Sequence, residues 1–164
     1  MKPTLLVIWH SSTGACQQLS AAIADGARSA AEVEVKLIHA REAEAAHALQ
    51  ADGLVFVSPE YLGGLAGLMK DFFDRSYYQL LEQVSAKPYA LAVCAGSDGS
   101  GAVRQLERIA LGLKLRAIAP ALLVCTHAQT PAAILAYKTL SSDDLQRANE
   151  LGATFAAGLS AGIY

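Results

Sequence analysis

The stretch TLLVIWHSSTGACQQLS, Thr4 to Ser20, joins an apolar run, a short polar loop and the start of a helical pattern. The run Thr4–Trp9 is apolar at successive positions, which is typical of a strand buried on both faces. The loop that follows, His10–Cys16, contains three hydroxyl residues and one glycine. Hydroxyls and a tight turn at the start of a helix predict a cradle for an anion.

Four further apolar runs are predicted as strands: Val33–Ile38, Gly53–Ser58, Tyr89–Cys94 and Ala117–Cys125. Val33–Ile38 alternates, with Glu34 and Lys36 on one side, as expected of an edge strand. Pro120 predicts that the first half of the last run is an edge or a bend. Pro59 is expected to end the third strand.

Segments with helical spacing of apolar residues lie between the predicted strands. They begin near Leu19, Leu65, Val103 and Leu145, and a short alanine-rich helix is predicted over Arg41–Gln50. The last helix is preceded by Ser141–Asp144, which supplies N-cap residues. Because strands and helices alternate throughout, residues 1–164 are predicted to form one α/β domain. We expect a three-layer doubly wound sandwich around a five-stranded parallel sheet.

Composition excludes several classes of protein. A chain with 53% hydrophobic and 17% charged residues has enough apolar residues for a full core and is not disordered. A net charge of -2 provides no basic surface for nucleic acid. No apolar run approaches the roughly 20 residues of a membrane span. We therefore expect a soluble cytoplasmic protein.

Cysteines and histidines do not form a metal-binding pattern. Cys16, Cys94 and Cys125 include no CxxC pair, which favours free thiols. His39 and His47 have no cysteine or carboxylate partner at ligand spacing. The sequence therefore predicts no metal site.

Three loops of unusual composition follow the first, third and fourth strands: His10–Cys16, Ser58–Gly67 and Cys94–Ala102. With the strand order 2-1-3-4-5, the carboxyl ends of these strands are neighbours at the point where ligands bind. The first loop has no lysine and no GxxxxGK[ST] motif, which favours a monophosphate over a nucleoside triphosphate. Each loop alone also fits a helix cap or a glycine-rich turn, but together they predict one binding site.

The three loops resemble those of flavodoxin-like proteins, in particular the NAD(P)H-dependent FMN reductases and related quinone reductases. HSSTGAC is similar to the phosphate loop, SPEYLGGLAGLMKDFFDR to the second flavin loop with its helix, and AGSDGSGAVRQLERIALGLKLR to the third. The resemblance implies that FMN is the cofactor. Ala15 and Cys16 stand where the family usually has asparagine and a hydroxyl residue, which predicts a weaker hold on the phosphate.

The resemblance also assigns cofactor-binding residues. The phosphate would be held by Ser11, Ser12, Thr13, Gly14, Ala15 and Cys16, with His10 beside them. The ring and ribityl chain would be lined by Pro59, Glu60, Tyr61, Leu62 and Gly63. The other side of the ring would be covered by Ala95, Gly96, Ser97, Asp98, Gly99 and Gly101.

The implied activity is that of an FMN-dependent oxidoreductase. NAD(P)H as co-substrate would give hydride to the flavin, and a quinone, another flavin or oxygen would take the electrons, so no catalytic protein residue is predicted. The alternatives are a flavodoxin-type electron carrier and a module that acts by protein interaction. Carriers are usually strongly acidic with an aromatic residue in the third loop, and this chain has neither feature. Tyr77 and Tyr78 predict the interface of a homodimer.

Overall fold

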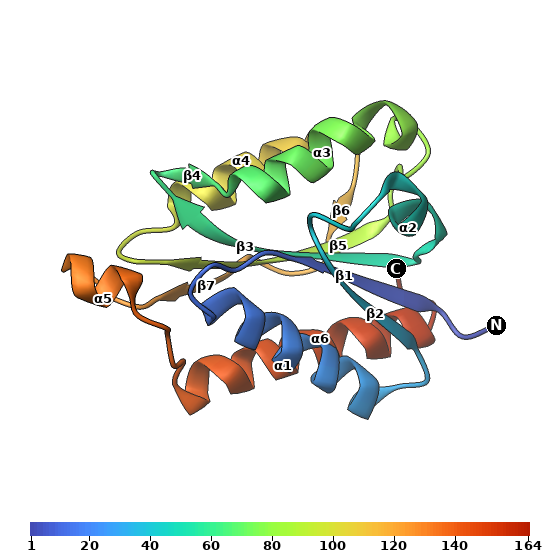
Figure 1. Ribbon diagram of the computed structural model, residues 1–164. Coiled ribbons are helices and arrows are strands. Elements are labelled where there is room, and N and C mark those ends of the chain that lie inside the picture. Colours follow the sequence, from blue (N-terminus) through green and yellow to red (C-terminus); the bar gives the residue numbers. More distant parts are fainter.

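The computed structural model describes residues 1–164, and a parallel sheet lies at its centre with helices on both faces (Figure 1). Its strands are β1 (Thr4–Trp9), β2 (Glu34–His39), β3 (Gly53–Tyr61), β5 (Pro88–Ala95), β6 (Arg116–Ala117) and β7 (Leu122–Cys125). They lie in the order β2-β1-β3-β5, and both β6 and β7 pair in parallel with β5. The predicted order 2-1-3-4-5 is confirmed, with the fifth strand in two pieces.

Two prolines have different effects on the strands. Pro120 lies in the break between β6 and β7, as its position in the sequence predicts. The prediction that Pro59 ends β3 is wrong, because the strand continues to Tyr61 and Pro59 pairs with Cys94. β3 pairs with β1 only as far as Val57, which lies opposite Trp9. At Pro59 the edge of β3 that faces β1 is therefore free. A proline is tolerated at such an edge because no N–H is needed there.

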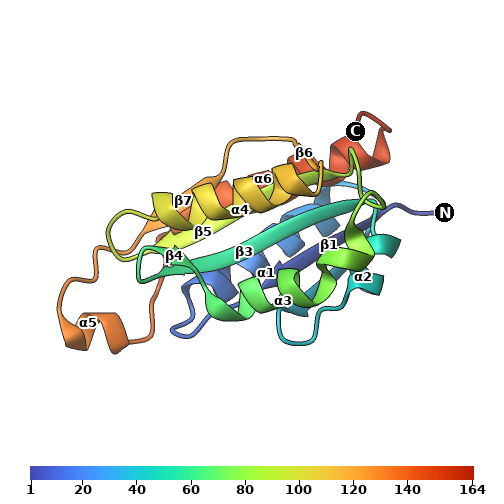
Figure 2. The same ribbon diagram turned by 90° about the horizontal axis from the view of Figure 1, so that it is seen from above.

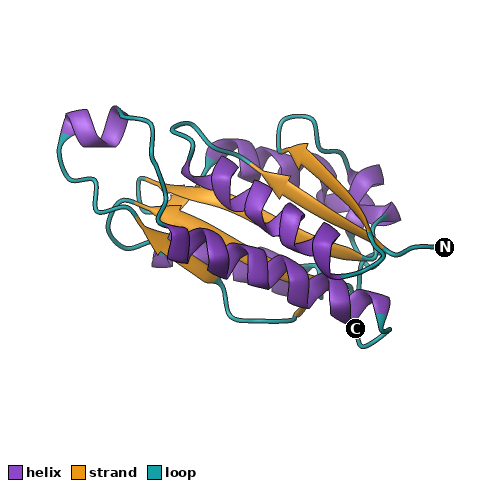
Figure 3. Ribbon diagram, turned by 90° about the horizontal axis from the view of Figure 1, so that it is seen from below, coloured by secondary structure: helices purple, strands orange, loops and turns teal.

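The helices form two layers (Figures 1 and 2). On one face lie α1 (Ala15–Ala30) and α6 (Ser142–Ser160), and on the other lie α2 (Ala45–Gln50), α3 (Gly67–Leu80) and α4 (Ser100–Gly112). A short helix, α5 (Pro131–Leu135), projects beyond the carboxyl edge of the sheet, as Figure 3 shows from below. None of the helices is both long enough and apolar enough to cross a membrane.

Alternate residues of each central strand enter opposite cores. Leu6 and Ile8 of β1 pack toward α3 and α4, in a cluster that includes Phe72. Leu5 and Val7 pack toward α1 and α6, in a cluster that includes Phe155. Side chains of a strand alternate between the two faces of its sheet, so a strand covered by helices on both sides must be apolar throughout.

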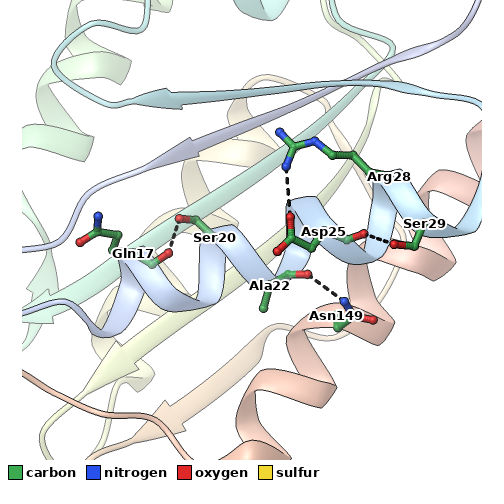
Figure 4. Close-up of polar contacts among 7 residues, drawn as sticks. All are labelled: Gln17, Ser20, Ala22, Asp25, Arg28, Ser29 and Asn149. Carbon is green, nitrogen blue, oxygen red and sulfur yellow. Dashed lines mark hydrogen bonds and ion pairs between the residues drawn. The ribbon is translucent and has the colours of Figure 1, made fainter.

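The two helices of one face approach closely at a pair of glycines. A Cβ atom on Gly26 would lie 2.0 Å from the carbonyl oxygen of Asn149, and one on Gly152 would lie 1.9 Å from that of Ile23. The amide of Asn149 donates to the carbonyl of Ala22 at 3.3 Å (Figure 4). This contact fixes α6 against α1, and the N-terminus of α1 is part of the site described next.

Candidate cofactor site

The three predicted loops meet at the carboxyl ends of β1, β3 and β5. They line a pocket of about 120 Å³ together with a fourth segment that follows β7. A second, more open pocket of about 530 Å³ adjoins it and shares Glu60, Tyr61, Gly96, Ala128 and Ile134. The two pockets form one groove whose inner end lies at the first loop. Such a groove at the switch point of an α/β sheet is the usual place for a ligand.

The first loop turns sharply into α1 at Gly14. This residue is the N-cap of the helix and has a φ of 90°. Its N–H donates to the hydroxyl of Ser11 at 3.0 Å. A side chain at this φ would be strained, and glycine allows the turn without that cost.

The N–H groups around Gly14 have no acceptor within the protein. Those of Ser12, Thr13, Ala15 and Cys16 take part in none of the hydrogen bonds of the structure, and neither do the hydroxyls of Ser12 and Thr13. The loop lines the inner pocket, so these donors are available to a ligand there. A helix N-terminus with free N–H groups and neutral hydroxyls fits the phosphate of FMN.

The second loop is a tight hairpin. β3 pairs with β4 (Gly64–Leu65) in antiparallel fashion, with Tyr61 opposite Gly64. The two turn residues, Leu62 and Gly63, both have positive φ, as in a type I′ turn. Leu62 is fully exposed, so it makes no packing contact that offsets its backbone strain. The hairpin extends over the outer pocket.

Glu60 joins the second loop to the third. Its carboxylate accepts the N–H of Gly99 at 3.1 Å and the N–H of Ala102 at 3.0 Å. These donors lie at the N-terminus of α4, where a negative charge is favoured. The side chain of Gln105 on α4 also accepts the N–H of Leu65 at 2.6 Å. The hairpin is therefore held against α4 from both of its strands.

Thirteen of the eighteen cofactor-binding residues predicted from the sequence line the groove, and His10 is one of the five that do not. Gly14 is covered by the ring of Tyr137, while Gly99 and Gly101 lie at the start of α4. Asp98 accepts a hydrogen bond from Ser100 at 2.6 Å. Three predicted residues outside the inner pocket line the outer one: Leu62, Gly63 and Ser97.

His10 lies behind the first loop in a chain of hydrogen bonds. The N–H of Arg41 donates to Nδ1 of His39 at 3.2 Å, so His39 carries its proton on Nε2. That nitrogen lies 3.1 Å from Nδ1 of His10, which must accept. Burial lowers the pKa of His10, and the neighbouring His39 and Arg41 lower it further. His10 is thus neutral at pH 7 and adds no charge to the site.

The thiols of Cys16 and Cys125 are also neutral. Burial, followed by contact with Cys94, raises the pKa of Cys16 well above its ordinary value. Burial and the nearby carboxylate of Asp98 raise the pKa of Cys125. Cys16 therefore brings no negative charge to the first loop that would repel an anion.

The sequence interpretation missed the fourth segment, residues 126–140. It contributes Thr126, Ala128, Ile134 and Lys138 to the inner pocket. Its start is attached to the third loop, since the N–H of Thr126 donates to the carbonyl of Ala95 at 2.8 Å. Thr130 as N-cap and Pro131 at the first helical position are the usual start of a helix and are the local signal that marks α5.

Several known proteins are similar to this chain in sequence. The family model for NADPH-dependent FMN reductase matches residues 40–130, which include the second and third loops. The chain is 36% identical over 97 residues to a flavodoxin of Aquifex aeolicus, a match that covers 59% of this chain and 50% of the relative. It is also 36% identical over 70 residues to an NAD(P)H-dependent FMN reductase of Schizosaccharomyces pombe, covering 43% and 32%. The matches therefore span half or less of these relatives.

The fold has close counterparts among solved structures. A flavodoxin from the domain Archaea superposes with a TM-score of 0.78 at 18% identity, over 95% of this chain and 98% of the other. At that identity the likeness concerns the fold alone. The family match, which extends over more than half of the chain, gives the more specific assignment. The chain belongs to the NADPH-dependent FMN reductase family, whose members bind flavin, and has the flavodoxin-like fold.

Proposed function

We propose that the protein is an FMN-dependent oxidoreductase that accepts hydride from NADH or NADPH and passes electrons to a quinone, a flavin or another small acceptor. The observation that carries the proposal is the set of unpaired donors at the N-terminus of α1, at the inner end of an open groove. Bound FMN supplies the redox chemistry. The protein binds the cofactor, orients it and leaves one side accessible.

Each loop has a separate task in this proposal. The N–H groups and hydroxyls of Ser12 and Thr13 receive the phosphate. Tyr61, which is 38% exposed, offers its ring at the junction of the two pockets. Gly96 offers backbone groups on the opposite wall without a side chain that covers the flavin.

The open outer pocket favours an enzyme over an electron carrier. The third loop, AGSDGSG, has no aromatic side chain to stack on the flavin, so a nicotinamide or a quinone has room there. A net charge of -2 is also small for a carrier that finds its partner through electrostatic attraction. A flavodoxin-type carrier remains the second candidate, because a flavodoxin is among the relatives.

We also propose that the protein is a homodimer. Tyr77 and Tyr78 of α3 are 40% and 85% exposed, and their rings touch edge to face at 5.5 Å between centroids. Tyrosines of this kind are enriched in interfaces, where a ring is covered and a hydroxyl tolerates water.

Anaerobic absorbance spectroscopy distinguishes these functions. The purified protein is mixed with equimolar FMN, and NADPH and then NADH are added while the visible flavin bands are recorded. We expect bleaching much faster than with free FMN. A bound-flavin spectrum that neither nucleotide reduces would instead identify an electron carrier. A spectrum identical to that of free FMN would contradict both functions.

A further inference from the structure

The first loop contains no cationic side chain, yet the fold brings one to it. Lys138 lines the inner pocket together with Ser11, Ser12 and Thr13. Its backbone N–H donates to the carbonyl of Thr13 at 2.8 Å. A lysine far along the chain is therefore fixed beside the donors that we assign to the phosphate.

The position of Lys138 is built from several hydrogen bonds. The amide nitrogen of Gln18 donates to the carbonyls of both Gly14, at 3.0 Å, and Lys138, at 2.6 Å. The amide oxygen of the same side chain accepts the N–H of Leu140 at 3.1 Å. One glutamine of α1 thus clamps the end of the 126–140 segment onto the first loop. The ring of Tyr137 covers Gly14 beside this clamp.

The ammonium group of Lys138 has no anionic partner in the protein. It donates to the carbonyls of Ile134 and Ala136 at the end of α5. None of the salt bridges of the structure includes it. An ammonium has three protons to donate, so one remains for a further acceptor. Lys138 is half-buried at the rim of the pocket, and its ammonium is available to bind an anion there.

We propose that Lys138 is a phosphate-binding residue of the FMN site, a role that rests on the proposed function. Its ammonium supplies the positive charge that the first loop lacks, and the free N–H groups of that loop supply the remaining donors. A charge-assisted hydrogen bond to a phosphate is stronger than one from a neutral group. Lys138 therefore compensates for the buried thiol of Cys16, which replaces a hydroxyl donor.

The experiment compares FMN with riboflavin, which lacks the phosphate. Equilibrium titrations followed by flavin fluorescence are made with the wild type and with Lys138→Gln, Lys138→Arg and Lys2→Gln. Lys2 lies beside Glu32 at the opposite edge of the sheet, so its substitution is a control for the change in net charge. Lys138→Gln is expected to weaken FMN binding about tenfold or more and to change riboflavin binding less than about twofold. Lys138→Arg and Lys2→Gln are expected to bind FMN nearly as well as the wild type.

Equal weakening of FMN and riboflavin by Lys138→Gln would overturn the proposal, because it would show that the lysine only supports the 126–140 segment. Unchanged FMN binding in Lys138→Gln would overturn it as well, while leaving the proposed function intact. A wild-type protein that binds neither flavin would overturn the proposed function and, with it, the role of Lys138.

Discussion

At the scale of the residue, His10 makes stability depend on pH. Its pKa is lower in the folded protein than its ordinary value of 6.5, so between these two values the unfolded chain binds more protons. The free energy of unfolding therefore rises with pH across that window and falls as the pH drops below about 6.5. A protonated His10 would also lose the lone pair that accepts from His39.

Urea unfolding of the wild type and of His10→Gln between pH 8 and pH 5 tests this effect. We expect the wild type to lose more stability than the variant as the pH falls through 6.5, and the two curves to run parallel above pH 7.5. His127→Asn is the matched control, because His127 lies in the loop after β7 and asparagine tolerates its φ of 55°. Parallel curves throughout the range would show that His10 does not titrate differently in the two states.

At the scale of the element, α3 carries the prediction of a dimer. Static light scattering is expected to give twice the mass of the 17.2 kDa chain. Tyr78→Glu is expected to shift the protein to a monomer that keeps its fold, since this side chain is 85% exposed in one chain. Leu111→Glu on α4, at 76% exposure, is the control and should stay dimeric. A wild-type protein of monomeric mass at working concentration would rule out the dimer.

The long elements and the short helix α2 could be predicted from the sequence, whereas β4 and α5 could not. β1 was expected over the residues that form it, and Gly53–Ser58 and Tyr89–Cys94 lie within β3 and β5. Helices covering both faces force a continuous apolar pattern on such strands, and that pattern is visible in one sequence. β4 has only two residues, and α5 buries none of its five, so neither produces a hydrophobic period.

At the scale of the whole molecule, topology accounts for the part of the site that could be predicted. Three loops separated in sequence meet because parallel strands present their carboxyl ends at one edge. The placement of Lys138 depends instead on Gln18, 120 residues earlier, and on the path of the 126–140 segment, whose only regular element is the five-residue α5. No local pattern encodes such a contact, so the charged part of the site emerged only from the structure. Glu60 was predicted to lie at the site, but the contact of its carboxylate with the start of α4 was not.

The most direct test of FMN binding at the first loop is a titration of FMN into the wild type and Ser12→Asp. Ser12 is exposed and its hydroxyl has no partner, so the new carboxylate should leave the fold intact and repel a phosphate in the cradle. Ser85→Asp, in the exposed loop before β5, adds the same charge at the opposite edge of the sheet. We predict one FMN per wild-type chain, the same affinity in Ser85→Asp and an affinity at least about a hundredfold lower in Ser12→Asp. Equal affinities in all three proteins, or no saturable binding by the wild type, would contradict the claim that the first loop holds the phosphate of FMN.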